Sequence, residues 1–510
     1  MPNATSTVFA RALRGIDAPG IIVETHIRGG LPGFSIVGLP ETAVREARDR
    51  VKSAILNSGF IFPRVRVTVN LAPADIPKEG GRFDLSIAIG ILCASKQLPD
   101  TKLMQMEILG ELGLTGDVRS VRGALSAAID ANLCGRALMV PCQNLEEASL
   151  LSCNTVYGVS NLLEACQVLK DTGKITTNES PSIPRHSPRN PISDLPQGED
   201  CQLNDVKGQF AAKRALIIAA AGAHHLLMTG PPGCGKTMLA LRLKNLLPAP
   251  DEQELASIIK IHSAAGYSDL SRLFANRPFR SPHHSASTTS ITGGGRPIMP
   301  GEISLAHSGV LFLDELPEFN RQLLESLREP MESREVMITR ANSRVKYPAA
   351  FQLVAAMNPC PVGRSCNENS CLCSPEQKRR YRSKISAPIM DRIDIHVQVE
   401  AVCEKDLFAD QVPVDENKLR ADVANAREIQ LKRNAGQLNS NLSTRALSTH
   451  CGLDDTSRNL LKQAIAKFSL SARACHRLLK VSRTIADLEK SNHIEAHHMS
   501  EALAYRRPAG

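Results

Sequence analysis

One stretch of the sequence decides its fold: Gly230-Pro231-Pro232-Gly233-Cys234-Gly235-Lys236-Thr237. Its spacing is that of a phosphate-binding loop, in which two glycines enclose four residues and are followed by lysine and threonine. Apolar residues 225–229 before the loop predict a strand, and residues 238–243 after it predict the start of a helix. In this context the backbone N–H groups at the helix N-terminus bind phosphates. The sequence therefore predicts that residues 230–237 bind ATP, with Lys236 directed at the β and γ phosphates and the Thr237 hydroxyl on Mg²⁺.

A second motif lies further along the chain, where apolar residues 309–313 predict a strand that ends in Asp314 and Glu315. In nucleotide-hydrolysing proteins with this loop, such an aspartate holds Mg²⁺ and the next carboxylate polarises the attacking water. A strand that ends in two carboxylates is common by itself. Together with the phosphate-binding loop, it predicts hydrolysis of ATP.

Length and composition bound the remaining possibilities. The 510 residues predict about three to four domains at roughly 100–200 residues each. The net charge of +9 permits an anionic partner without requiring one, and the absence of Trp argues against an aromatic stacking platform for bases. The first fifteen residues have no apolar signal segment, and no apolar run has the length of a membrane span. Fourteen cysteines in so long a chain favour reduced thiols, and we expect a cytoplasmic protein without membrane partners.

The pattern along the chain predicts a multidomain α/β protein. Residues 171–200 are rich in proline and serine and predict an extended linker. The unit before it, residues 1–170, mixes a strand pattern at 63–70 with helix patterns at 41–57, 85–95 and 121–133. After the linker we expect an α/β core over residues 201–400 and a mostly helical unit over residues 401–510.

Three further segments resemble AAA+ ATPases. Residues 351–358 form a strand pattern that ends in Asn358 and resemble sensor 1, which implies that Asn358 orients the water. Residues 390–394 resemble the arginine-finger segment of the magnesium-chelatase and MCM-like branch, which implies that Arg392 reaches ATP on a neighbouring subunit. Residues 470–474 are similar to sensor 2, which implies a role for Arg473 at the same site. The resemblance implies an AAA+ core with a C-terminal helical lid.

Longer strings are similar to the ComM/YifB proteins, which are bacterial magnesium-chelatase-like AAA+ proteins. They are GLPGF (30–34), IVGLPE (36–41), NLAPADIPKEGG (70–81), RPFRSPHHSAS (277–287), PGEISLAH (300–307) and LPEF (316–319). The resemblance runs from residue 8 to residue 507 outside the linker. It implies a hexameric ATP-dependent DNA motor that promotes branch migration when single-stranded DNA is integrated during natural transformation. A metal-insertase subunit and a protein-remodelling ATPase of the same branch remain alternatives.

The first unit resembles the Lon-protease/ribosomal-S5-like α+β fold through GELGLTGDVR at residues 110–119. A Lon-type protease requires a serine nucleophile that a lysine activates. The corresponding stretch, residues 78–88, has no serine at the nucleophile position, and Ser86 falls later, in a predicted helix. We therefore expect a scaffold or a DNA-guiding module rather than a protease.

Four cysteines are close together in the sequence, Cys360, Cys366, Cys371 and Cys373. Four thiolates make a closed tetrahedral site for structural Zn²⁺. The ComM/YifB proteins commonly have Cys-Pro-Cys-Gly here, whereas this chain has Val362 in place of the second cysteine. Zinc on four cysteines, looser binding by three and no metal at all remain open.

Two inserted hairpins are expected to face the pore of a ring, as they do in this AAA+ branch. One lies around residues 281–299, and the other spans residues 335–347 with Arg340, Arg344 and Lys346 near its turn. Basic residues at a turn suit contacts to DNA phosphates that read no sequence, although a solvated hairpin has the same pattern. His283 and His284 suggest a metal site, but a polar loop that contacts DNA or backbone is the simpler interpretation.

Overall fold

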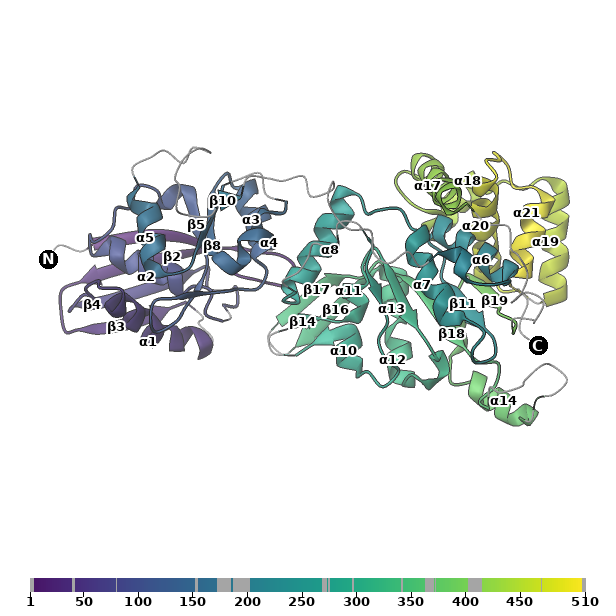
Figure 1. The fold of residues 1–510 in the computed structure, drawn as a ribbon, viewed down its shortest axis with the longest axis horizontal. Helices are drawn as coiled ribbons and strands as arrows, with labels where there is room; N and C mark the ends of the chain where they lie inside the picture. Colours follow the sequence, from purple (N-terminus) through teal and green to yellow (C-terminus); the bar gives the residue numbers. More distant parts are fainter. Residues whose placement is uncertain are drawn as a thin grey trace.

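The computed structural model describes residues 4–38, 42–78, 80–151, 155–171, 185–186, 202–267, 273, 276–295, 298–340, 343–362, 371, 373–401, 415–468 and 470–506. Its shape is elongated, with an N-terminal lobe at one end, a sheet-centred core in the middle and a helical region at the other end (Figure 1). Within these residues no helix has both the length and the apolar character that crossing a bilayer requires. The chain is mixed α/β, as predicted.

The N-terminal lobe is built on an eight-stranded mixed sheet in the order β10-β9-β8-β5-β1-β2-β4-β3. Its strands are β1 (Ala4–Arg11), β2 (Gly20–Arg28), β3 (Gly33–Val37), β4 (Arg66–Ala72), β5 (Met106–Ile108), β8 (Ala137–Pro141), β9 (Val156–Val159) and β10 (Arg185–His186). A separate pair is formed by β6 (Glu111–Leu112) and β7 (Val118–Arg119). Buried and exposed residues alternate along β2 and β4, because successive side chains of a strand point to opposite faces.

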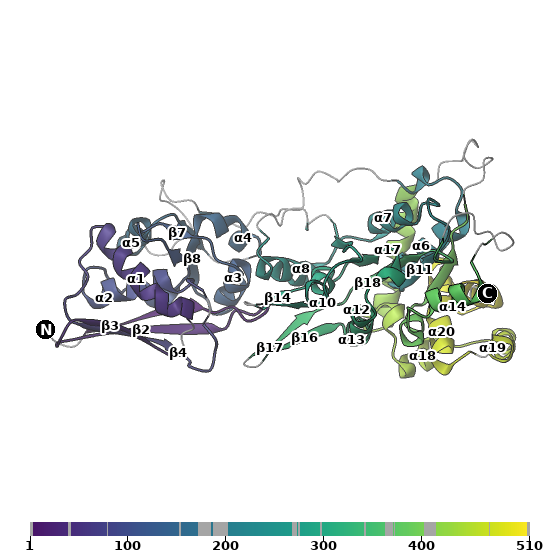
Figure 2. The ribbon, with the colours of Figure 1, turned by 90° about the horizontal axis from the view of Figure 1, so that it is seen from below.

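The helices of this lobe are α1 (Thr42–Asn57), α2 (Asp84–Ala94), α3 (Ala124–Leu133), α4 (Leu145–Ser149) and α5 (Leu162–Lys170). Helices α1 and α2 lie on one face of the sheet, above β2, β3 and β4 in Figure 2. Every residue of α2 is buried, so it forms the centre of the lobe's core. The predicted strand and the three predicted helices are confirmed by β4, α1, α2 and α3. The predicted linker falls mostly outside the described residues; two of its residues, Arg185 and His186, pair with β9.

The core of the molecule is a five-stranded sheet in the order β12-β15-β18-β11-β19, and all its strands are parallel. They are β11 (Leu226–Thr229), β12 (Phe279–Arg280), β15 (Val310–Leu313), β18 (Gln352–Met357) and β19 (Ile395–Gln398). Strands β15 and β18 are buried along their whole length, as expected of a parallel sheet that is covered on both faces. The strands predicted at 225–229, 309–313 and 351–358 are confirmed by β11, β15 and β18.

Helices surround this sheet, and two antiparallel pairs extend from it towards the N-terminal lobe (Figures 1 and 2). The helices are α6 (Phe210–Gly222), α7 (Lys236–Leu246), α8 (Glu252–Ala264), α10 (Thr288–Thr292), α11 (Glu302–Leu305), α12 (Arg321–Ser326), α13 (Arg328–Ser333), α14 (Pro375–Arg382) and α15 (Ala387–Met390). The pairs are β13 (Gly293–Gly294) with β14 (Met299–Pro300) and β16 (Glu335–Arg340) with β17 (Ser343–Pro348).

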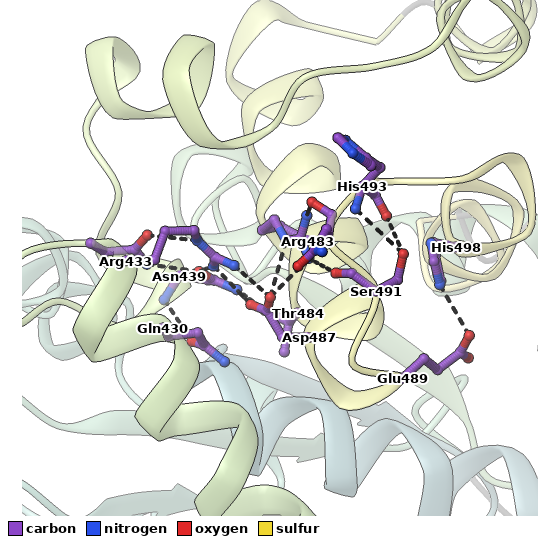
Figure 3. Close-up of polar contacts among 12 residues, drawn as sticks. Gln430, Arg433, Asn439, Arg483, Thr484, Asp487, Glu489, Ser491, His493 and His498 are labelled. Carbon is purple, nitrogen blue, oxygen red and sulfur yellow. Dashed lines mark hydrogen bonds and ion pairs between the residues drawn. The ribbon is translucent and has the colours of Figure 1, made fainter.

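The C-terminal region consists of helices α17 (Glu416–Arg433), α18 (Thr444–His450), α19 (Asp455–Phe468), α20 (Ala472–Leu488) and α21 (Ala496–Ala504). A buried polar network holds it together (Figure 3). The Asp487 carboxylate accepts hydrogen bonds from Arg433 of α17, from Asn439 of the following turn and from Arg483 of α20. Because buried charges are costly unless they are paired, this network fixes α17, the turn and α20 relative to one another.

Candidate nucleotide-binding site

The loop 230–237 has room for phosphates because of its glycines. A Cβ at Gly230 would lie 2.1 Å from the carbonyl oxygen of Val399, so only glycine fits where the loop begins. Gly233 and Gly235 have φ of 78° and 88°, and nothing lies within 4 Å of a Cβ placed on either. Helix α7 starts directly after them at Lys236. The loop is therefore open on the side where the helix N-terminus favours an anion.

Lys236 is held at the base of this loop. Its ammonium group donates to the carbonyl oxygens of Gly230 and Pro231, each at 2.8 Å, and to the side-chain oxygen of Asn358 at 3.2 Å. Strand β18 lies directly beside β11, which places Asn358 at the end of the strand next to the loop. The sheet order thus brings together two residues that are 122 positions apart in the chain.

Thr237 and Asp314 also meet at this edge. The Thr237 hydroxyl donates to Oδ2 of Asp314 at 2.7 Å, and the Glu315 backbone N–H donates to Oδ1 of the same carboxylate at 2.9 Å. A hydroxyl and a carboxylate oxygen are ligands that Mg²⁺ prefers, so the donor set fits this ion. Glu315 has a left-handed backbone with φ of 53°. A non-glycine residue in this conformation costs roughly 1–2 kcal/mol, and such strain is concentrated at functional sites.

His284 lies beside Glu315, which the sequence did not predict. Its Nδ1 is 3.5 Å from Oε2 of Glu315, and its ring packs edge-on against Phe319. His283 instead contacts the Ser285 hydroxyl at 2.8 Å through its Nδ1. The paired histidines were visible in the sequence, but only the folded chain shows that one of them reaches the carboxylate predicted to polarise water.

Arg392 and Arg473 do not join this group. Arg392 precedes β19, and the loop follows β11; because these strands are parallel neighbours, Arg392 and the loop lie at opposite edges of the sheet. The Arg392 side chain is only 6% exposed, donates to the Pro388 carbonyl and pairs with Glu332 at 2.7 Å. Arg473 is half exposed and lies 3.4 Å from the same Glu332 carboxylate. Neither arginine is placed to reach a nucleotide on its own loop.

Comparison with known proteins identifies the family to which this chain belongs. The family described as "Magnesium chelatase, subunit ChlI" matches residues 202–407, "Subunit ChlI of Mg-chelatase" matches residues 23–144, and "Magnesium chelatase, subunit ChlI C-terminal" matches residues 415–506. The competence protein ComM of Haemophilus influenzae is 46% identical over 506 residues, which are 98% of this chain and 97% of the relative. The chain belongs to the ComM/YifB family of magnesium-chelatase-type proteins.

Two other relatives show how much of this ComM/YifB-type chain is similar to YifB and how much to a magnesium-chelatase subunit. The protein YifB of Escherichia coli is 45% identical over 502 residues, which are 98% of this chain and 97% of the relative. The magnesium-chelatase 67 kDa subunit of Heliobacterium mobile is 30% identical over 186 residues, only 31% of this chain and 28% of the relative. Similarity over the whole length is thus to ComM and YifB, and similarity to this chelatase subunit is confined to a segment.

The cysteine cluster of this ComM/YifB-type chain lies next to the candidate nucleotide-binding site. The sulfur atoms of Cys360, Cys371 and Cys373 lie within 4.8 Å of one another, which is the spacing of ligands around one metal ion. Cys366 lies outside the described residues. Cys360 follows Asn358 by two residues, so a metal on these thiols would anchor the loop that leaves β18. Three soft thiolates fit Zn²⁺.

The two expected hairpins of this ComM/YifB-type chain differ in form. The second is a regular antiparallel pair, β16 and β17. Arg344 is exposed on it, while Lys346 pairs with Glu335 across the pair at 2.5 Å. The Arg340 backbone ends β16, and its side chain lies outside the described structure. The first contains helix α10 and only two residues in each strand, so it is more compact than the hairpin that the sequence predicts.

Proposed function

We propose that this protein is an ATP-hydrolysing, ring-forming DNA motor of the cytoplasm that drives branch migration when transforming DNA is integrated during natural competence. The observation that carries the ATPase part is the meeting of Lys236, Thr237, Asp314 and Asn358 at the carboxyl edge of the central sheet. The DNA part is supported by full-length similarity to a relative named competence protein ComM.

Each residue of the site then has a role that its position allows. The loop 230–237 holds the phosphates, and Lys236 neutralises charge on them. Thr237 and Asp314 hold Mg²⁺, which supplies Lewis-acid stabilisation of the phosphoryl oxygens when it is bound. Glu315 accepts a proton from the attacking water, and Asn358 orients that water by a hydrogen bond.

A ring explains why Arg392 lies at the opposite edge of the sheet. In a head-to-tail ring each subunit presents one edge to the site of the next, so Arg392 and Arg473 complete the neighbour's nucleotide site. Glu332, which pairs with both arginines, is half exposed and holds them together in the isolated chain. An arginine supplied by a neighbour stabilises charge in the transition state. We propose a hexamer.

We divide the chain into a Lon/S5-like domain (1–170), a linker (171–200), an AAA+ core (201–400) and a helical lid (401–510). The first domain guides DNA or supports the ring and does not cleave peptides. The Ser86 hydroxyl is buried and donates to the Phe83 carbonyl at 2.8 Å, and the buried Lys78 ammonium donates to the Pro73 carbonyl. Neither side chain is available as a nucleophile or as its base.

DNA should stimulate the ATPase, and the β16–β17 pair should contribute to DNA binding. We expect a higher ATPase rate with single-stranded or forked DNA, and branch migration of a three-strand substrate with ATP. Arg344→Ala should weaken DNA binding roughly ten-fold, because hydrogen bonds to charged groups contribute about 1.5 kcal/mol. It should also reduce the slope of log K against log salt by about 1.

The control for that experiment is Arg458→Ala, which removes an exposed arginine of α19 that pairs with Asp455 far from the β16–β17 pair. It should leave DNA binding unchanged. A wild-type protein that hydrolyses ATP but neither binds DNA nor responds to it would refute the motor. That result would favour the metal-insertase or protein-remodelling alternative.

Zinc should be bound by the cysteine cluster at about one ion per chain. Cys371→Ser should lose most of this zinc, because Cys371 offers one of three sulfur atoms within 4.8 Å. It should also lower the melting temperature and the ATPase rate, since the cluster anchors the loop after Asn358. Elemental mass spectrometry of purified protein measures the zinc. Cys475→Ser, in helix α20, is the matched control. Wild-type protein free of zinc after growth in zinc-containing medium would contradict the assignment.

A further inference from the structure

A cavity of about 180 Å³ lies at the edge of the central sheet opposite the nucleotide loop. Its sheet-side wall is made by residues that precede four parallel strands: His225 before β11, Gly309 before β15, Phe351 before β18 and Asp394 before β19. The loop 230–237, Asp314, Glu315 and Asn358 all follow these strands. The cavity is therefore separate from the candidate nucleotide site, with the length of the strands between them.

Helices of the C-terminal region close the other side of this cavity. Arg427 comes from α17, Arg477 comes from α20, and Asn441 belongs to the turn between α17 and α18. The network around Asp487 fixes that turn, because Asn439 donates to Asp487 and to Thr484 (Figure 3). The helical side of the cavity is thus held in place by the Asn439 contacts to Asp487 and Thr484, and none of these three residues lines the cavity.

Among the described residues, four arginines but two carboxylates line the cavity. Both carboxylates are already engaged. Glu254 pairs with Arg277 through both of its oxygens, at 2.6 and 2.9 Å. Asp394 pairs with Arg477 and His224. Burial alone would raise the pKa of Asp394, but Arg477 and the two histidines outweigh burial and hold this pKa well below its usual range.

Two of these arginines, Arg427 and Arg334, form no ion pair with any carboxylate of the described residues. Arg427 is 7% exposed, and among the described residues its guanidinium group donates to the carbonyl oxygen of Ala220 alone. Burial first, and then the charge of Arg277, lower the pKa of Arg427 to about 9, because together they outweigh the attraction of Glu254, which already pairs with Arg277. The Arg334 side chain is exposed at the rim and has neither an ion pair nor a hydrogen bond to any residue in the described part of the chain. Lys480 donates at 2.9 Å to the carbonyl oxygen of Ser440, which lines the cavity. The Lys480 ammonium group is therefore a further positive charge near the cavity.

A buried cation without a counter-charge is costly, and a bound anion removes that cost. Guanidinium groups present paired N–H donors that match the oxygens of a phosphoryl group. The volume holds several water-sized spheres but lies below the range of about 300–1,000 Å³ typical of sites for larger ligands. We propose that this cavity is a second anion site, which binds a phosphate group between Arg427, Arg477 and Arg334.

Such a site joins the sheet-centred core to the helical region. Arg334 follows α13 of the core, whereas Arg427 and Arg477 belong to α17 and α20. A phosphate group bound by all three would favour the arrangement in which the helices rest against the amino edge of the sheet. The group comes either from free phosphate or from a nucleotide on an adjoining copy of the chain, and the two sources can be distinguished.

The first arm of the test uses inorganic phosphate and the full chain with Lys236→Ala, which removes competition by the nucleotide loop. Isothermal titration should show saturable binding with a Kd of about 1 mM or below. Arg334→Gln in this background should weaken binding about ten-fold, and Arg427→Met should abolish it. Arg334 is exposed without a partner among the described residues, so its replacement tests the site even if Arg427→Met fails to fold. Arg420→Gln, exposed on α17, should have no effect.

The second arm uses a non-hydrolysable ATP analogue and wild-type protein, at concentrations below and above those at which copies associate. Phosphate binding that Arg334→Gln weakens in the first arm identifies the free anion as the ligand, whereas phosphate binding that Arg334→Gln leaves unchanged lies elsewhere and overturns the proposal. The alternative outcome is that phosphate does not bind in the first arm and that Arg334→Gln weakens the affinity for the analogue only when copies are associated. That outcome identifies the nucleotide of an adjoining copy as the ligand. If phosphate does not bind in the first arm and Arg334→Gln leaves analogue affinity unchanged, the proposal is overturned.

Discussion

Glu315→Gln should lower the turnover number for ATP by about 10²–10⁴-fold, the range that a positioned general base contributes. Glutamine has nearly the same shape as glutamate but cannot accept the proton of the attacking water. The Glu315 backbone N–H, which bonds to Asp314 at 2.9 Å, is unaffected by the substitution. Thr237 and Asp314 therefore keep their contact, and ATP binding should be unchanged.

Two measurements on the same protein check this expectation. Steady-state hydrolysis gives the turnover number, and titration with a fluorescent ATP analogue gives the affinity. Glu318→Gln is the matched control, because Glu318 lies three residues further along, is similarly exposed and pairs with Lys384. The control should hydrolyse ATP at nearly the wild-type rate. Full turnover by Glu315→Gln would show that another group activates the water.

Many elements of the candidate nucleotide site could be predicted because local sequence specifies them. The loop 230–237 needs glycines at fixed positions, and the strands before Asp314 and Asn358 are short apolar runs that must be buried. These constraints act within a few residues, so they are visible in the sequence. The role of Asn358 came from the resemblance to AAA+ proteins, and the strand order that brings Asn358 to Lys236 was not predicted.

Contacts between distant parts of the chain could not be predicted. The approach of His284 to Glu315 depends on how the segment before α10 folds over the sheet, and no periodicity in the sequence encodes that. The same holds for Arg427, which donates to a carbonyl 207 residues away. Charged side chains are usually exposed, so no pattern in the sequence predicts four arginines around one cavity.

Arg392→Ala should lower ATP turnover about 10³-fold, the lower end of what an arginine finger contributes. The reason is loss of positive charge next to the phosphates bound by the adjoining subunit. A structural role is the competing explanation, because Arg392 is 6% exposed and pairs with Glu332 in its own chain. Truncating a buried arginine can destabilise the fold, so the melting temperature must be measured with the rate.

Mixing two inactive variants separates these explanations. Lys236→Ala cannot use its own nucleotide loop but still presents Arg392, whereas Arg392→Ala has an intact loop. In a mixed ring, some interfaces combine the intact loop of an Arg392→Ala subunit with the intact Arg392 of a Lys236→Ala subunit. If subunits pair at random head to tail, roughly a quarter of the interfaces have this combination. We expect each variant alone to be inactive and the equimolar mixture to regain roughly that share of the wild-type rate.

Glu332→Gln adds a test of how Arg392 is released. Glu332 accepts from Arg392 at 2.7 Å and lies 3.4 Å from Arg473, so the carboxylate competes with a neighbour's phosphates for both cations. If the arginines act across the interface, removing this charge should leave turnover intact or raise it. If Arg392 only supports its own chain, Glu332→Gln should instead destabilise the protein, and mixing the two inactive variants should restore nothing. The two explanations therefore predict opposite results in both experiments, and a failure to fold cannot imitate recovery of activity in the mixture.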